Sequence, residues 1–325
     1  MNLLPHIGID FGTYKTRIVS KYSTEIYEEP TVVAAKDGKL LDFGQAALAS
    51  KNNLSVEIIH PLQNGEIANS QIGEAFIYGF YKSLSISSKI FRAKVFVSCS
   101  TSKSEVNKQA IHELVKTSIG SDVFLLDTLT SILALQDKEK LSPQNPCFVL
   151  HIGAGNTALG IFTNQGVAFS MYIPFGGDYF DKLIQRQVYA VTQKRISLFD
   201  CQNIKHEIGT LDKTQNERMW QGDVQCLSGE TEGIKINSTE IKMAMEKGLN
   251  TIADDVEWFI AGLPDDFADK LKQKSFLLSG GCGYIPGIEK WLTNRLGVGI
   301  TVVPEPDKVV IRGIQKLLSE QIRAQ

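Results

Sequence analysis

The chain lacks closely spaced cysteines and histidines. Its five cysteines are an odd number, lie far apart and include no C-x-x-C pair, and its five histidines show no metal-ligand spacing. A disulfide framework and a zinc site are therefore not expected, and a reducing cytoplasm is the expected compartment.

Long apolar runs and a strong net charge are also missing. No apolar run approaches the roughly 18 to 20 residues that a membrane span needs, and residues 1–5 are too few to form a signal peptide. The formal charge of −2 gives no bulk electrostatic reason to bind nucleic acid or acidic lipid. We expect a soluble protein, and its 325 residues are enough for about two domains.

The chain does contain an alternation of strand-like and helix-like segments, which indicates the α/β class. The pattern predicts strands on both sides of a turn within 7–19, and at 93–99, 123–126, 148–152 and 276–278. It predicts helices at 72–83, 104–118, 129–135 and 178–193, and a long one from about Asn237, where Glu240 completes a capping box.

A polar segment with two prolines, residues 136–146, predicts the boundary between two halves. We expect one domain over 1–138 and a second over 139–325. Residues 209–233 are polar and contain glycine, which suits a small excursion from the second domain.

One motif occurs in each half. Residues 9–16 (IDFGTYKT) can be laid over residues 150–157 (LHIGAGNT). In both copies an apolar strand ends in a polar residue, and an apolar residue, a glycine, three further residues and a threonine follow. Two matched strand–turn–strand units predict two similar domains that face one another across a cleft.

Such turns can bind phosphate. Glycine lets the backbone approach a ligand closely, and successive N–H groups form a concave anion site. The hydroxyls of Thr13, Thr16 and Thr157 can add donors, and the Asp10 carboxylate can hold Mg²⁺ through its waters. One such hairpin alone is an ordinary turn more often than a site, but two matched copies favour a nucleotide site.

A third glycine cluster, SGGCG at residues 279–283, lies between a buried strand and a helix that opens at 285–288. A strand, a glycine-rich turn and a helix in this order suit the sugar and base of a nucleotide. The cluster is weak evidence alone, because any close strand-to-helix connection can require glycine.

These motifs together resemble the actin and heat-shock-chaperone superfamily, and within it the bacterial actins of the MreB and MamK type. Residues 7–19 resemble the first phosphate motif, residues 148–162 the second, and residues 276–287 the adenosine motif. Further matching segments follow in the expected order at 29–33, 61–68, 176–181 and 204–209.

The resemblance implies an actin-like α/β fold in which two RNase-H-like domains close on ATP and Mg²⁺. Each domain would carry a small inserted subdomain, within about 28–75 and about 190–240, and a C-terminal helix at about 306–325 would pack back on the first domain. The resemblance also implies that the chain polymerises with itself into double filaments that serve cell shape or organelle positioning.

Carried over position by position, the resemblance assigns nucleotide-binding residues to three turns and one helix. They are Asp10, Gly12, Thr13, Tyr14, Lys15 and Thr16 in the first motif, His151, Gly153, Ala154, Gly155, Asn156 and Thr157 in the second, Gln202 and Lys205 beside the adenosine, and Gly280, Gly281, Cys282 and Gly283 in the adenosine turn. Asp10 is also the candidate ligand for Mg²⁺ through water.

The first departure from the family pattern is His151, which stands where an aspartate is usual. A histidine cannot replace a carboxylate that holds hydrated Mg²⁺. Two interpretations stay open: His151 contacts a phosphate directly, or it is satisfied by neighbours in the wall of the cleft.

The second departure concerns hydrolysis. Thr128 stands where bacterial actins usually place a water-orienting glutamate, and Leu129 replaces the proline that follows it. Asp127 and Thr128 are the candidate catalytic residues. Loss of a positioned general base costs roughly 10²- to 10⁴-fold in rate, so we predict nucleotide binding with slow or absent hydrolysis.

Two other functions fit the same fold. A small-molecule kinase would need a carboxylate base over its acceptor hydroxyl, for which Asp127 is the candidate. A non-polymerising adaptor would use the fold as a scaffold. Membrane contact has one candidate, an apolar loop tip within 86–92, although core side chains that lead into the next strand explain this segment more simply.

Overall fold

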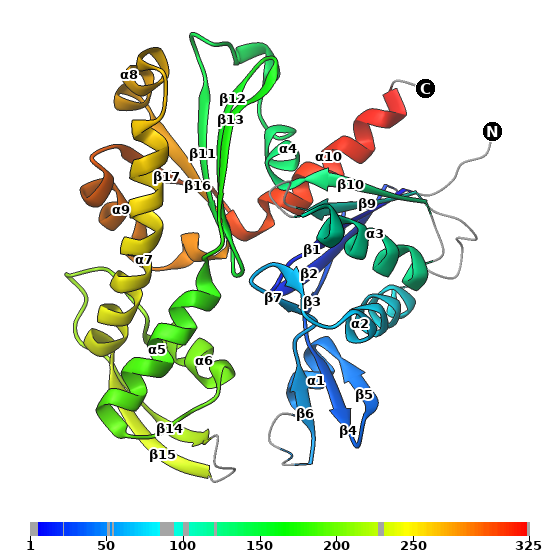
Figure 1. Ribbon diagram of the computed structural model, residues 1–325, viewed down its shortest axis with the longest axis vertical. Coiled ribbons are helices and arrows are strands. Elements are labelled where there is room, and N and C mark those ends of the chain that lie inside the picture. The colour runs from blue at the N-terminus through cyan, green and yellow to red at the C-terminus, as the bar shows by residue number, and fades with distance from the viewer. Residues whose placement is uncertain are drawn as a thin grey trace. The chain divides into compact units, whose positions relative to one another are not determined.

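The chain folds into two compact units (Figure 1). The computed structural model describes residues 6–21, 23–50, 53, 55–84, 94–99, 104–119, 122–226 and 231–323. Unit 1 comprises Met1–Leu141, Asn164–Ala168 and Lys308–Gln325, and unit 2 comprises Ser142–Thr163 and Phe169–Asp307. The candidate membrane loop at 86–92 lies outside the described residues.

Unit 1 is built on a five-stranded sheet with the order β10-β9-β1-β2-β3. Its strands are β1 (His6–Phe11), β2 (Lys15–Ser20), β3 (Ile26–Pro30), β9 (Lys94–Cys99) and β10 (Asp122–Asp127). β1, β2 and β3 pair antiparallel, whereas β9 is parallel to both β1 and β10. Residues on both faces of β1 are buried, which explains its nearly continuous apolar sequence.

Helices cover both faces of this sheet (Figure 1). α2 (Ser70–Ser83) and α3 (Glu105–Ile119) pack together on the face that carries Ile7 and Ile9. α4 (Thr128–Leu133) and the C-terminal α10 (Val309–Arg323) pack together on the other face, where α10 lies against β1. Gly8 makes room for α10, because a Cβ there would lie 2.4 Å from Cγ2 of Ile314.

A small sheet in the order β5-β4-β6 extends from unit 1. It consists of β4 (Val33–Lys36), β5 (Lys39–Phe43) and β6 (Glu57–Ile59), with α1 (Gly44–Ala49) beside it. The turn between β4 and β5 places Asp37 and Gly38 at φ values of 50° and 72°, the left-handed pair that this dipeptide favours in a two-residue hairpin. A separate hairpin, β7 (Leu62–Gln63) and β8 (Glu66–Ile67), precedes α2.

Unit 2 repeats this plan with a five-stranded sheet in the order β13-β12-β11-β16-β17. Its strands are β11 (Cys147–Ile152), β12 (Thr157–Thr163), β13 (Gly166–Ile173), β16 (Ser275–Ser279) and β17 (Gly299–Val302). β11 pairs antiparallel with β12 and parallel with β16, as β1 pairs with β2 and β9. The predicted internal repeat is therefore confirmed in three dimensions.

The helices of unit 2 are α5 (Gly177–Thr192), α6 (Leu198–Ile208), α7 (Ser238–Ala261), α8 (Asp265–Gln273) and α9 (Ile288–Leu296). α7 begins with the predicted capping box, in which Asn237 and Glu240 each accept the other's backbone N–H. The polar segment 209–233 contributes to a hairpin of β14 (Met219–Gln225) and β15 (Thr231–Asn237). Short 3-10 turns occur at Lys138–Lys140, Gly281–Tyr284 and Pro306–Lys308.

The first boundary between the units falls between Leu141 and Ser142, within the polar segment 136–146. The limits of the inserted subdomains, about 28–75 and 190–240, stay a prediction. In the described part of the chain, no helix combines the length and the apolar character that a membrane crossing requires.

Replacing Gly313 tests how α10 is seated on unit 1. A Cβ at this position would lie 1.8 Å from the backbone oxygen of Ser131 in α4, so an alanine must push the two helices apart. We expect Gly313→Ala to lower the free energy of unfolding by about 2 kcal/mol in urea melts, although alanine favours helix more than glycine does. Ser319→Ala, at an exposed position of α10, is the control. A Gly313→Ala protein as stable as the wild type would contradict this packing.

Candidate functional site

The first glycine turn connects β1 and β2. Phe11 and Thr16 face each other at the end of the hairpin, and residues 12–14 form the turn between the two strands. A Cβ on Gly12 would lie 2.5 Å from the backbone oxygen of Lys15, so the tight turn excludes any other residue at position 12.

Thr31 holds this turn from behind. Its hydroxyl donates to the backbone oxygen of Gly12 at 2.7 Å, and its N–H donates to the backbone oxygen of Tyr14 at 3.0 Å. Oγ1 of Thr16 lies 2.9 Å from Oγ1 of Thr31, and both threonines are fully buried. Because the single proton of the Thr31 hydroxyl goes to Gly12, Thr16 donates to Thr31. The Thr16 hydroxyl therefore stabilises the turn from inside the protein.

The second glycine turn, between β11 and β12, is held in the same way by the start of α5. The N–H of Gly177 donates to the oxygen of Gly153, and the N–H of Asp178 donates to the oxygen of Ala154, each at 2.9 Å. Gly176 permits this approach, because a Cβ there would lie 2.5 Å from the oxygen of Gly153. The buried Thr157 hydroxyl donates to the oxygen of Phe175 at 2.8 Å.

These contacts fix the direction of the amide groups in both turns. In a trans peptide the C=O and the N–H point in opposite directions. The oxygen of Gly12 faces Thr31, so the N–H of Thr13 points away from it. The oxygens of Gly153 and Ala154 face α5, so the N–H groups of Ala154 and Gly155 point away from that helix. Neighbouring N–H groups with one direction form an anion-binding concavity.

A polar pair precedes each turn. In unit 1 the hydroxyl of Ser98, on β9, donates to the carboxylate of Asp10 at 2.8 Å. In unit 2, Nδ1 of His151 lies 3.0 Å from Oγ of Ser279, on β16. Burial lowers the pKa of His151 to about 4, so its imidazole is neutral at pH 7.

A buried ion pair lies beneath the second turn. Nζ of Lys205, on α6, is 2.8 Å from the Asp181 carboxylate of α5 and donates to the oxygen of Gly177 at 3.0 Å. Burial opposes the charge on Lys205, but the carboxylate of Asp181 keeps the pKa of this lysine above its ordinary value. Lys205 therefore ties α6 to the first turn of α5. Gln202 lies one helical turn earlier in α6 and is half-buried.

The third turn follows β16 and touches the second. Gly280 has a φ of 90°, and a Cβ there would lie 2.2 Å from the oxygen of Ile152. Gly283 packs on Pro306, and the Cys282 thiol, whose pKa burial raises to about 12, donates to the oxygen of Gly153 at 3.6 Å. Gly281 is different, because it is exposed and a Cβ there would meet no atom within 4 Å.

The candidate catalytic residues lie at the start of α4. Asp127 is the N-cap of that helix, where its Oδ1 accepts the N–H groups of Leu129 at 2.9 Å and Thr130 at 3.2 Å. Thr128 is the first residue of the helix. The capping geometry gives the Asp127 carboxylate a structural role.

The structure distributes the predicted residues between the two units. Those of the second and third motifs, with Lys205, come together within unit 2, and those of the first motif lie in unit 1. Tyr14 is partly exposed, and Lys15 donates to the carboxylate of Glu28 at 2.8 Å. Asp10 is the carboxylate beside the first turn that could hold a hydrated Mg²⁺, whereas the neutral His151 does not fit that role.

Five residues that organise the turns were absent from the predicted site: Thr31, Ser98, Gly177, Asp181 and Ser279. Four of them lie in segments that the sequence had already marked, 29–33, 176–181 and 279–283. The Gly-Gly pair at 176–177 was the strongest overlooked signal, because two adjacent glycines at a helix start indicate a close backbone approach. Ser98 had no local signal.

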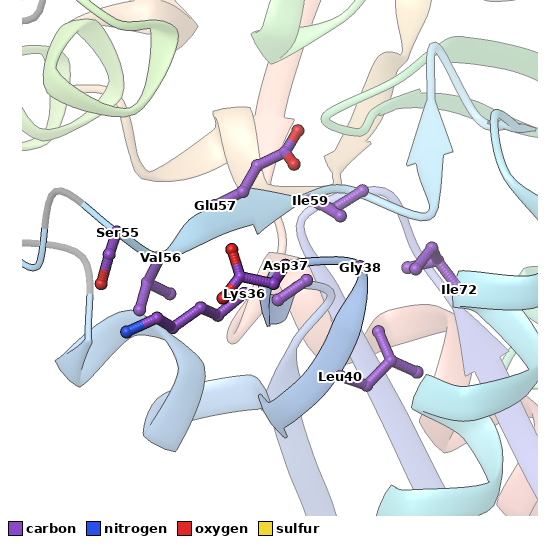
Figure 2. Close-up of a pocket in the computed structure, with 10 residues that line it drawn as sticks. Lys36, Asp37, Gly38, Leu40, Ser55, Val56, Glu57, Ile59 and Ile72 are labelled. Carbon is purple, nitrogen blue, oxygen red and sulfur yellow. The ribbon is translucent and has the colours of Figure 1, made fainter.

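A surface pocket of about 450 Å³ lies elsewhere, on the small sheet of unit 1. Figure 2 shows its lining, which comes from β4, β5, β6 and the start of α2 and includes Lys36, Gly38, Leu40 and Ile72. Its lining includes no residue of the glycine turns.

Comparisons with known proteins agree with the geometry. A family model described as MreB/Mbl protein matches residues 4–325. The cell shape-determining protein Mbl of Bacillus subtilis is 24% identical over 318 residues, which cover 96% of this chain and 95% of the relative. The cell shape-determining protein MreB of Escherichia coli K12 is 26% identical over 322 residues, which cover 96% and 92%.

Two solved structures share the fold. MreB5 of Spiroplasma citri bound to AMPPNP has a TM-score of 0.86 at 22% identity and covers 100% of this chain and 98% of its own. The MamK double helical filament has a TM-score of 0.77 at 16% identity, with coverage of 96% and 98%. The predicted actin-like α/β fold and the resemblance to bacterial actins are therefore confirmed.

The half-buried His151 predicts a loss of stability in acid. Its pKa is about 4 in the folded chain against an ordinary value of 6.5, so the unfolded chain binds more protons between these two pH values. The contribution of the neutral His151 to the free energy of unfolding is thus fully present above pH 6.5. It is lost as the pH falls towards 4. Between pH 7 and pH 5, we expect the free energy of unfolding of the wild type to fall by about 2 kcal/mol more than that of His151→Asn, as measured in urea melts. Parallel pH profiles for the two proteins would contradict an imidazole that is neutral at pH 7 because its pKa is lowered.

Proposed function

Because this chain belongs to the MreB/Mbl family of actin-like cytoskeletal proteins, we propose that it is a cytoplasmic filament subunit that binds ATP or ADP with Mg²⁺. The observation that carries the proposal is the fixed direction of the turn amides. Thr13, Ala154 and Gly155 each present an N–H whose peptide is held from behind by a donor of the same unit. Such fixed donors suit the phosphates of a nucleotide.

The relatives support both the ligand and the assembly. The Spiroplasma citri MreB5 structures contain AMPPNP in one case and ADP in the other, and MamK is seen as a double helical filament. We extend these properties to this chain as proposals. Its partner is then a second copy of itself, and cell shape is the role that the names of Mbl and MreB suggest.

Each turn would have its own task. The N–H groups of Ala154 and Gly155 would bind phosphate oxygens, and Lys15 would exchange its exposed partner Glu28 for a phosphate. Asp10 would hold Mg²⁺ through water, and the ion would neutralise phosphate charge. The open surface of Gly281 would lie against the adenosine.

Hydrolysis is proposed to be slow or absent. Asp127 already accepts two N–H groups as the N-cap of α4, and Thr128 has no basic group. The same capping role weakens the alternative of a small-molecule kinase, which would need Asp127 as a base. ATP binding can still favour a polymer, because a ligand shifts a conformational equilibrium by its differential affinity. Slow hydrolysis would then give long-lived filaments.

Calorimetry with ATP and Mg²⁺, joined to electron microscopy, tests the proposal. We expect the wild type to bind ATP and to form filaments when ATP is present. We expect its phosphate release to be roughly 10²- to 10⁴-fold slower than that of a bacterial actin with a positioned glutamate. Filaments with rapid phosphate release would contradict the assignment of Asp127 and Thr128.

Gly281→Val is the matched variant. Since a Cβ at Gly281 meets no protein atom within 4 Å, valine should leave the free energy of unfolding within about 0.5 kcal/mol of the wild type. We expect it to weaken ATP binding about tenfold by occupying the space proposed for adenosine. Failure of the wild type to take up any adenine or guanine nucleotide would overturn the proposed function.

A further inference from the structure

Each unit carries a polar pair at the same place, immediately before its glycine turn. In unit 1 the pair is Asp10 and Ser98, 2.8 Å apart. In unit 2 it is His151 and Ser279, 3.0 Å apart. In both units the first member lies on the strand that enters the turn, and the serine lies on the neighbouring parallel strand.

The two pairs are equivalent by strand register. Ile9 is level with Val97 in the β1–β9 pairing, which brings Asp10 level with Ser98. His151 is level with Ser279 in the β11–β16 pairing. The chain therefore contains its own comparison, with a carboxylate at one turn and an imidazole at the equivalent position of the other.

The equivalent pair of unit 1 indicates the direction of the hydrogen bond between Ser279 and His151. The Ser98 hydroxyl donates to Asp10, and an equivalent Ser279 hydroxyl would donate to Nδ1 of His151. A neutral imidazole has one donor and one acceptor, so Nε2 then carries the hydrogen. Nε2 lies on the side of the turn, 3.6 Å from where a Cβ of Gly153 would be.

A carboxylate and a neutral imidazole act oppositely on a nearby phosphate. A carboxylate repels the phosphate unless a cation lies between them. An imidazole with hydrogen on Nε2 adds no negative charge and supplies a donor. His151 would thus join the N–H groups of Ala154 and Gly155, which already point away from α5.

We propose that His151 makes the second turn a phosphate site that works without a metal ion, with Nε2–H donating to a phosphate oxygen. Nucleotide binding by this chain then depends only weakly on Mg²⁺, whose remaining ligand is Asp10. This inference rests on the proposed function, because it concerns how the same nucleotide is held.

The decisive experiment measures the Kd for ADP by calorimetry with Mg²⁺ and with EDTA. For the wild type we expect the EDTA value to exceed the Mg²⁺ value by less than about fivefold. His151→Asp restores a carboxylate next to the phosphate. We therefore expect the ratio of the Kd in EDTA to the Kd in Mg²⁺ to be about tenfold larger for this variant than for the wild type. His112→Asp is the control, since His112 lies on α3 in unit 1 and its ring is beside Glu113; its ratio should equal that of the wild type.

A second measurement does not depend on whether the variant folds. The ¹⁵N shifts of the His151 ring in the wild type at pH 7 should show hydrogen on Nε2 and an acceptor at Nδ1. Hydrogen on Nδ1, or a doubly protonated ring, would overturn the proposal.

The outcomes separate the two claims. Wild-type protein that binds ADP with Mg²⁺ but loses more than about fivefold in affinity in EDTA would overturn the role of His151 and leave the proposed function intact. A wild type whose affinity for ADP rises with Ni²⁺ but not with Mg²⁺ would also overturn it, because imidazole is a favoured ligand of Ni²⁺ and His151 would then be a metal ligand. Absence of binding under every condition would reject both.

Discussion

The arrangement of both glycine turns depends on the way their carbonyl groups are held from behind. Thr31 donates hydrogen bonds to the backbone oxygens of Gly12 and Tyr14. The first residues of α5 donate to the backbone oxygens of Gly153 and Ala154. With the carbonyl oxygens held by these donors, the amide hydrogens of the same peptides point away from the donors. The capacity to bind an anion is therefore built into the backbone before any ligand arrives, which reduces the cost of ordering the site on binding.

The two units reach this result with different donors. In unit 1 the donor is Thr31, at the point where the chain leaves β3 for the small sheet. In unit 2 the donors belong to a helix start that the buried pair of Lys205 and Asp181 joins to α6. The first turn is thus connected to the small sheet and the second to α5 and α6. A movement of the small sheet, or of α5 and α6, would therefore shift the backbone of the turn to which it is bonded.

The sequence predicted the local features well, because they depend on residues close together in the chain. The capping box of Asn237 and the repeated glycine turns are of this kind. It did not predict the pairs Asp10–Ser98 and His151–Ser279, whose members are 88 and 128 residues apart and meet only through strand register. It left two interpretations of His151 open, and the structure places Nδ1 of the ring 3.0 Å from Oγ of Ser279. It treated Asp127 as a catalytic candidate, whereas its helix-capping role appears only once α4 is placed.

The central claim is that backbone amides of the turns bind the phosphates. The most direct test is the amide ¹H–¹⁵N spectrum of the full chain titrated with ADP. The account predicts that the signals of Thr13, Ala154 and Gly155 move most and saturate together. If ADP binds and shifts other signals while these three stay fixed, the phosphates lie elsewhere and the claim is wrong.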